Sequence, residues 1–68
     1  MEYFERMKAL RGERGETQSA VAEAIGMTTR QYQRYEAGCQ KPGLDYLMAL
    51  ADHFEVTLDY LTGRTDER

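Results

Sequence analysis

The stretch Gln18–Ala37, QSAVAEAIGMTTRQYQRYEA, decides the fold of this 68-residue chain. Val21 and Ile25 stand four residues apart, which places both side chains on one face of a helix. Gly26 ends that helix, because glycine readily takes the left-handed conformation that follows many helix ends. Thr28 is a residue type that favours the N-cap of a new helix. The stretch therefore predicts two helices joined by one tight turn.

The second helix of this pair, expected over Thr29–Ala37, divides into a buried and an exposed face. Thr28 is its N-cap, and Gln31 stands where a glutamine completes a T-x-x-Q capping box. At about 100° per residue, Tyr32 and Tyr35 define the side that faces the protein. The polar side chains that point away from it are Arg30, Gln33 and Arg34. Arginine can pair with guanine and glutamine with adenine, so the pattern predicts a helix-turn-helix whose second helix enters the DNA major groove.

The rest of the chain predicts three further helices and no strand, because alternation of apolar and polar residues never persists for four residues. The expected helices are Tyr3–Arg14, Gln18–Ile25 capped by Thr17, Thr29–Ala37, a fourth that starts near Gly43, and a short fifth capped by Thr57. The expected buried stripes are Phe4, Met7 and Leu10 on the first helix, and Leu44, Leu47, Leu50, Ala51 and Phe54 on the fourth. Residues 1–63 are expected to form one all-α domain, followed by a loose polar tail, residues 64–68.

These residues resemble those of the phage repressor and Cro-type helix-turn-helix family. The opening FERMKALRGERGETQ resembles the first helix of that family and its run into the second helix. The stretch KPGLDYLMALADHFEVTLDYLTG resembles its fourth and fifth helices. The resemblance therefore covers the chain from about Tyr3 to Gly63. It implies an all-α, five-helix repressor-like domain with the helix-turn-helix at helices 2 and 3, which regulates transcription by binding double-stranded DNA.

The resemblance also implies a set of DNA-binding residues. The positions that read bases or lie at the groove edge are Thr28, Thr29, Arg30, Gln33 and Arg34. The positions that it implies for phosphate contact are Gln18 and Lys41, and Thr17 is expected to join them through its backbone N–H group. Free backbone N–H groups at the start of the second helix suit the same task, because a helix N-terminus attracts anions. Cys39 stands where the family commonly has a basic residue, so one phosphate contact is expected to be missing.

Two further positions concern the support of the second helix of the motif. In the family an acid at the position of Glu36 pairs with an arginine of the first helix, here Arg11. Such an ion pair would fix the angle of the recognition helix; the alternative is an exposed glutamate without energetic consequence. Tyr32 replaces a branched aliphatic residue of the family and is expected in the core, where its hydroxyl needs a partner.

The charge balance runs against nucleic-acid binding when it is taken over the whole chain. The net charge is −3, whereas nucleic-acid binding domains are usually basic. Residues 1–42 contain seven Lys and Arg against six Asp and Glu, and residues 43–68 contain two against six. The acidity therefore belongs to the half that does not contain the helix-turn-helix. The basic balance is thin, so weak non-specific binding and marked salt sensitivity are expected.

Composition excludes several other classes of protein. One cysteine, Cys39, allows no internal disulfide and favours a reducing compartment, so a cytoplasmic location is expected. No apolar stretch approaches the roughly 20 residues of a membrane span. His53 is the only histidine, and one histidine with one cysteine cannot form a zinc site. Phosphate-binding loops and nucleophile motifs are absent, so we expect no enzymatic activity, no cofactor and no small-molecule ligand.

Two functions from different classes fit this pattern. The first is a sequence-specific regulator, expected to be a repressor, that binds a palindromic operator as a homodimer, because one recognition helix reads too few base pairs to select a site. Its dimer contact is expected at the end formed by the fourth and fifth helices, with Tyr46, Tyr60 and the residues near Leu58. The alternative is a protein-interaction module on the same scaffold, an antitoxin-like subunit or an antirepressor, which the thin basic balance favours.

Overall fold

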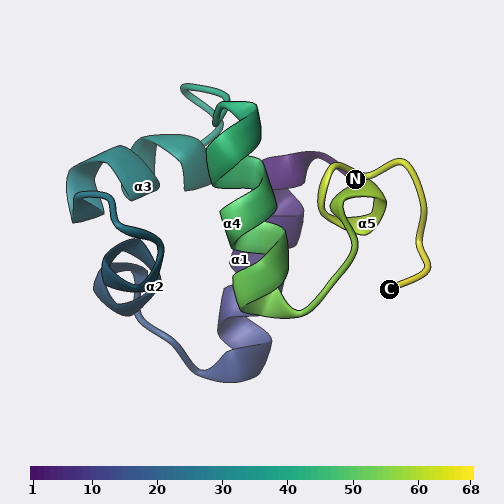
Figure 1. Cartoon of the computed structure of the whole chain (residues 1–68), viewed down its shortest axis with the longest axis horizontal. Helices are drawn as coiled ribbons and strands as arrows, with labels where there is room; N and C mark the ends of the chain where they lie inside the picture. The colour runs from purple at the N-terminus through teal and green to yellow at the C-terminus, as the bar shows by residue number, and fades with distance from the viewer.

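The computed structural model describes residues 1–68 and contains five helices and no strand. The helices are α1 (Tyr3–Arg14), α2 (Gln18–Ile25), α3 (Thr29–Glu36), α4 (Leu44–Phe54) and α5 (Leu58–Leu61). α4 crosses in front of α1 at the centre, with α2 and α3 on one side and α5 and both chain ends on the other (Figure 1). The predicted all-α, five-helix fold is confirmed. None of the helices has the length and apolar character that crossing a membrane requires.

Threonine N-caps begin three of the helices, as the sequence predicts. The hydroxyls that accept a backbone N–H are those of Thr17 from Ala20 at 3.0 Å, Thr28 from Gln31 at 3.1 Å and Thr57 from Tyr60 at 3.1 Å. The predicted T-x-x-Q capping box at α3 forms only in part, because the Thr28 cap is present and the return hydrogen bond of Gln31 is not. The Gln31 amide donates to the Gln40 side chain at 3.3 Å, so it does not return to the cap. α3 also ends one residue early, with Ala37 as its C-cap.

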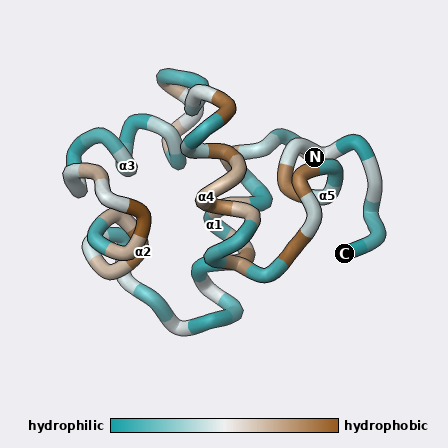
Figure 2. The backbone as a smooth tube through the Cα atoms, in the orientation of Figure 1, coloured by the Kyte–Doolittle hydropathy of each residue, from teal (hydrophilic) through white to brown (hydrophobic).

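The core is formed where the five helices meet. Its buried side chains are Tyr3, Met7, Leu10, Val21, Ala22, Tyr32, Tyr35, Leu50, Ala51, Phe54 and Leu61. Tyr32 and Tyr35 thus bury one face of α3, as predicted, and leave the helix largely hydrophilic outside (Figure 2). Phe4 is only half-buried and packs against the core, its ring lying 3.0 Å from the Cβ that a side chain at Gly38 would carry.

The predicted buried stripe of α4 is wrong at Leu44. The side chain is 62% exposed, and Met48 one turn later is 51% exposed. Both residues lie to one side of the direction that Leu50 and Phe54 set toward the core, so their side chains are turned away from it. α4 therefore carries an exposed apolar pair on its flank.

Side chains of residues 64–68 contact α1 and α5. The Asp66 carboxylate accepts a hydrogen bond from Arg6, whose side chain is 5% exposed. Arg68 pairs with Glu13 on the exposed side of α1. The Arg6 and Arg68 guanidinium carbons lie 4.0 and 5.3 Å from the centre of the Tyr60 ring. A buried guanidinium needs a carboxylate, and this segment supplies it.

Candidate nucleic-acid interface

The outward face of α3 carries two arginines that no acid neutralises. Arg30 and Arg34 are both exposed, four residues apart on one face. The arginines that do pair with carboxylates are Arg6, Arg11, Arg14, Arg64 and Arg68. Burial of Tyr32 and Tyr35 on the opposite face fixes the direction in which α3 presents this pair. Two guanidinium groups are therefore free to bind an acceptor outside the protein.

Two threonines stand at the start of α3, beside the start of α2. Thr28 is exposed, and its hydroxyl oxygen accepts the cap hydrogen bond from the backbone N–H of Gln31. The proton of this hydroxyl remains free to donate a hydrogen bond to a ligand. Thr29 is half-buried and donates to the Ser19 hydroxyl at 3.3 Å. Ser19 lies on the exposed surface of α2.

Gln33 lies on a different flank of α3 from the two arginines. Its side-chain amide donates to the Gln18 carbonyl oxygen at 3.2 Å. Helical spacing places Gln33 beside Thr29 and Glu36, on the flank that faces α2. The structure thus brings Gln33 to Gln18, a residue expected to contact phosphate, and holds its side chain on the flank toward α2.

Arg11 and Glu36 form a two-pronged ion pair that ties α3 to α1. Arg11 Nε and Nη2 lie 2.9 and 2.8 Å from the two carboxylate oxygens of Glu36. Gln18 adds a hydrogen bond to Glu36 at 3.3 Å, and Arg11 Nη1 donates to the Glu16 carbonyl at 3.0 Å. The Glu36 side chain is 4% exposed and that of Arg11 20%. Parallel N–H···O bonds of this kind hold the angle between two helices.

The acidity of Glu36 reflects this pairing. Burial by itself would raise the pKa of the Glu36 carboxyl, but the hydrogen bonds from Arg11 outweigh it, so the pKa lies below its ordinary value of 4.5. The hydrogen bond to Glu36 also raises the pKa of Arg11. The hydroxyl of neighbouring Tyr32 is buried without a hydrogen-bond partner, and its burial raises the pKa of the phenol. The Glu36 carboxylate and the Arg11 guanidinium lie close enough to this hydroxyl to affect its pKa.

A second acid joins the loop between α1 and α2 to α4. Both carboxylate oxygens of Glu16 lie 3.0 Å from His53 Nε2, and Arg14 donates to Glu16 at 3.0 Å. Burial would raise the pKa of Glu16, but these two partners outweigh it and lower the pKa. The loop that leads into α2 is therefore anchored from both sides.

An open hollow of about 540 Å³ lies between α1, the start of α2 and α3. It is lined by Lys8, Arg11, Thr17, Gln18, Gln33, Glu36 and Ala37. The backbone N–H groups of Gln18 and Ser19 have no backbone acceptor, so they remain available at its edge. Lys8 was not singled out from the sequence, although its spacing of three residues from Arg11 places both on one face of α1.

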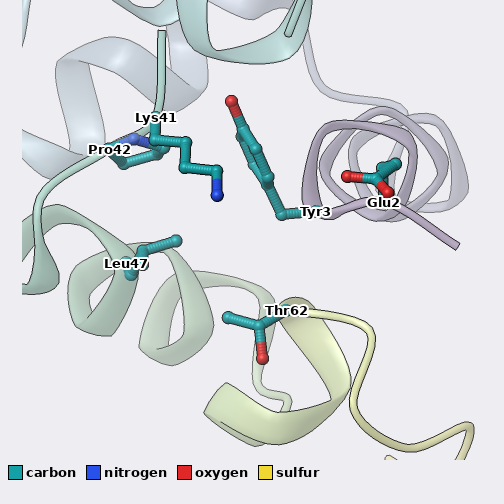
Figure 3. A pocket seen from close by; sticks show the side chains of 6 residues that line it. All are labelled: Glu2, Tyr3, Lys41, Pro42, Leu47 and Thr62. Atoms are coloured by element: carbon teal, nitrogen blue, oxygen red, sulfur yellow. The ribbon is translucent and has the colours of Figure 1, made fainter.

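Lys41 lines a different hollow, of about 200 Å³, on the other side of α3's C-terminal loop. Figure 3 shows its ammonium group pointing toward the ring of Tyr3, with Pro42, Leu47 and Thr62 around it. Tyr3 in turn donates to the Gln40 carbonyl at 2.8 Å. Lys41 and Gln18 are therefore not brought together, and any phosphates that they contact are different ones.

The two tyrosines expected at a dimer contact have different surroundings. Tyr46 packs 6.1 Å from Tyr35, ring centre to ring centre, and lines a hollow beside the turn between α2 and α3. Tyr60 lies between Arg6 and Arg68. The chain contains no group of three His, Cys, Asp or Glu side chains that could hold a metal ion.

Residues 7–61 match the family described as Helix-turn-helix. The HTH-type transcriptional regulator YobD of Bacillus subtilis is 40% identical over 65 residues, which are 96% of this chain and 58% of that protein. The cryptic phage CTXphi transcriptional repressor RstR of Vibrio cholerae is 36% identical over 69 residues, 98% of this chain and 62% of that protein. The chain thus spans about three-fifths of the length of these relatives.

Solved structures share the same helical arrangement. A transcriptional regulator from Listeria innocua superposes with a TM-score of 0.87 at 30% identity, covering 98% of this chain and 63% of that chain. The P22 c2 repressor in complex with a synthetic operator superposes with a TM-score of 0.85 at 24% identity, covering 90% of this chain and 92% of that chain. Both likenesses confirm the five-helix fold predicted from the sequence.

Proposed function

The chain belongs to the helix-turn-helix family, and from this membership we propose that it is a sequence-specific DNA-binding regulator of transcription. We propose further that it acts as a repressor of the phage type in the cytoplasm. The relative RstR is named a phage transcriptional repressor, which supports the choice of repressor over activator. Since the chain is shorter than its relatives, the proposal concerns the DNA-binding step.

The observation that carries this proposal is the placement of the unpaired cations. Of the nine Lys and Arg side chains, five form ion pairs with carboxylates within the protein. The four without such a pair are Lys8, Arg30, Arg34 and Lys41. All four belong to α1, α3 or the loop after α3, and the two arginines form the outward face of α3. A groove lined with phosphate attracts this surface although the whole chain is acidic.

Base reading is assigned to the start and the outward face of α3. Arg30 and Arg34 can each donate two hydrogen bonds to a guanine, and Thr28 and Thr29 can contact a thymine methyl group or a base acceptor at the groove edge. Phosphate contact is assigned to the start of α2, with its free N–H groups, and to Lys41.

We propose that two copies bind one palindromic operator through the side of the molecule formed by α4 and α5. Leu44 and Met48 lie one turn apart on α4 and are more than half exposed, and Leu58 on α5 is half-buried. A second copy would remove this apolar pair from water. Tyr46 and Tyr60 are engaged within the domain, so Leu44 and Met48 replace them as the centre of the contact. The patch is small, so the free protein pairs mainly on DNA.

The proposal is tested by selection from a randomised duplex pool, with binding followed by electrophoretic mobility shift. The wild-type chain should enrich one motif, and Arg30→Ala and Arg34→Ala should each weaken binding to that motif by about 1–3 kcal/mol. Arg64→Ala is the matched control, because Arg64 is 80% exposed and belongs to the segment after α5, and α5 lies on the other side of α4 from α3 (Figure 1). Failure of the wild-type chain to enrich any sequence would favour the protein-interaction module instead.

The dimer is tested separately on the selected motif. Native mass spectrometry should give two chains per duplex with both half-sites, and Leu44→Ser with Met48→Ser should reduce the cooperativity of binding. One chain per duplex at saturating protein would refute pairing without touching the proposal of DNA binding.

A further inference from the structure

We infer that Lys8 and Gln33 serve the DNA backbone and not the bases: Lys8 contacts a phosphate directly, and Gln33 positions Gln18 for one. This inference rests on the proposed DNA-binding function and divides the polar residues of the site differently from the sequence pattern. Its basis is the open hollow between α1, α2 and α3, which these three residues line together.

The hydrogen bonds of Gln18 define what the residue can still do. Its carbonyl oxygen accepts from the Gln33 amide at 3.2 Å, and its own amide donates to Glu36 at 3.3 Å. A glutamine amide carries two N–H donors, so one donor remains for a ligand. Gln33 binds the carbonyl oxygen of the Gln18 side chain, and Glu36 accepts one of its two N–H groups. The amide is therefore held in one orientation on the lining of the hollow, and so is its remaining N–H. Gln33 is thus a positioning residue.

The charge of the hollow favours an anion. The charge of Glu36 is balanced by Arg11 at 2.8 Å, so this pair contributes little net charge. Lys8 is exposed and has no carboxylate within ion-pair distance, which leaves one uncompensated positive charge on the lining. The base edges of a groove have no net charge, whereas each phosphate carries one negative charge. A cation beside two amide groups is therefore better matched to the phosphate backbone of DNA than to the base edges.

Geometry separates this set from the base-reading residues. Arg34 and Gln33 lie on opposite sides of the outward direction that the buried tyrosines of α3 define, and the Gln33 side chain is held on the flank toward α2. One N–H of the Gln33 amide is taken up by Gln18, and the two-point pairing of a glutamine with adenine would require the amide to turn away from α2. Base reading is therefore left to Arg30 and Arg34, with Thr28 and Thr29 at the groove edge.

The test compares variants in selection from a pool of randomised 20-base-pair duplexes, chosen on the order of two helical turns long. Gln33→Ala and Lys8→Gln should enrich the same motif as the wild-type chain, while the affinity falls severalfold and by the same factor for every sequence tested. Arg34→Ala should alter the enriched motif at one base position. Circular dichroism checks that each variant keeps its helices.

Salt dependence gives a second measurement for Lys8. The slope of log K against log salt on a random-sequence duplex should decrease in magnitude by about 1 in Lys8→Gln, and Lys8→Arg should restore it. Gln33→Ala should leave the slope unchanged, since glutamine carries no charge. An unchanged slope in Lys8→Gln, or an altered base preference in Gln33→Ala, would overturn the inference. Absence of any DNA binding by the wild-type chain would overturn the proposed function and this inference with it.

Discussion

Replacing Arg11 should lower the free energy of unfolding of this domain more than replacing any exposed arginine. Arg11→Met keeps the aliphatic stem but leaves the Glu36 carboxylate, with its side chain 4% exposed, without its cation. Breaking a buried ion pair from one side costs about 3–5 kcal/mol. Arg11 itself is 20% exposed and Gln18 still donates to Glu36, so we expect the lower end, about 3 kcal/mol. That is a large share of the few kcal/mol available to a core of this size.

The matching change on the other side should cost less. Glu36→Leu leaves a guanidinium that can turn toward water, so we expect a loss of about 1–2 kcal/mol. The double variant Arg11→Met with Glu36→Leu removes both charges together. Its loss should be smaller than the sum of the single losses by about 1–3 kcal/mol, the range for residues in direct contact.

Urea unfolding followed by far-ultraviolet circular dichroism measures these differences, provided that the m-value stays constant. Thermal unfolding gives a second reading, since each kcal/mol corresponds to about 4–8 °C in a domain of this size. The control is Arg64→Met, whose guanidinium lies 3.9 Å from Asp59 and is 80% exposed. It should change the stability by less than about 0.5 kcal/mol. Additive losses, or an Arg11→Met variant as stable as the control, would refute a coupled pair that fixes α3.

Three further changes test other parts of the structure. The pKa values of Glu16 and Glu36 are lowered from 4.5. The stability that these two ionised carboxylates contribute should therefore be complete above pH 4.5 and be lost as the pH falls through their lower folded-state pKa values. Urea unfolding at a series of acidic pH values measures this loss. Tyr32→Phe removes a buried hydroxyl without a partner and should leave the urea midpoint unchanged or raise the stability by about 1 kcal/mol; a clear loss would show that the hydroxyl is bonded. Asp66→Asn removes the carboxylate that pairs with buried Arg6, so it should lower the stability by about 1 kcal/mol and make residues 64–68 more sensitive to protease. Unchanged protease resistance would show that this ion pair does not hold the segment.

The helices could be predicted from the sequence because their signals are local. Threonine caps act on N–H groups three residues away, and the left-handed glycines Gly15 and Gly26 end helices within one turn. The outward direction of Arg30 and Arg34 followed from two tyrosines on the same helix. Each of these features depends on residues within one or two turns of one another.

The features that sequence reasoning missed join residues far apart in the chain. Arg6 meets Asp66 across 60 positions, and Gln33 meets Gln18 across 15. Helical spacing placed Gln33 on the exposed side of α3, which is correct, but the direction of a long side chain depends on its neighbour in α2. Leu44 was assigned to the core from its spacing alone, because the spacing does not reveal where the neighbouring helices end.

The pairing of side chains in the folded protein also explains how an acidic chain can present a surface suited to DNA. The net charge of −3 counts every ionised group equally. In the folded protein five arginines are paired with carboxylates, so those charges act mainly within the domain or close to its surface. The cations left unpaired are Lys8, Arg30, Arg34 and Lys41, and none of them lies in residues 43–68, where six of the twelve acids are found. Screening confines each charge to about 10 Å at 0.1 M salt, so a phosphate beside α3 experiences the arginines there more strongly than the distant acids. The sign of the local field therefore follows from which side chains are paired, and the total composition does not determine it.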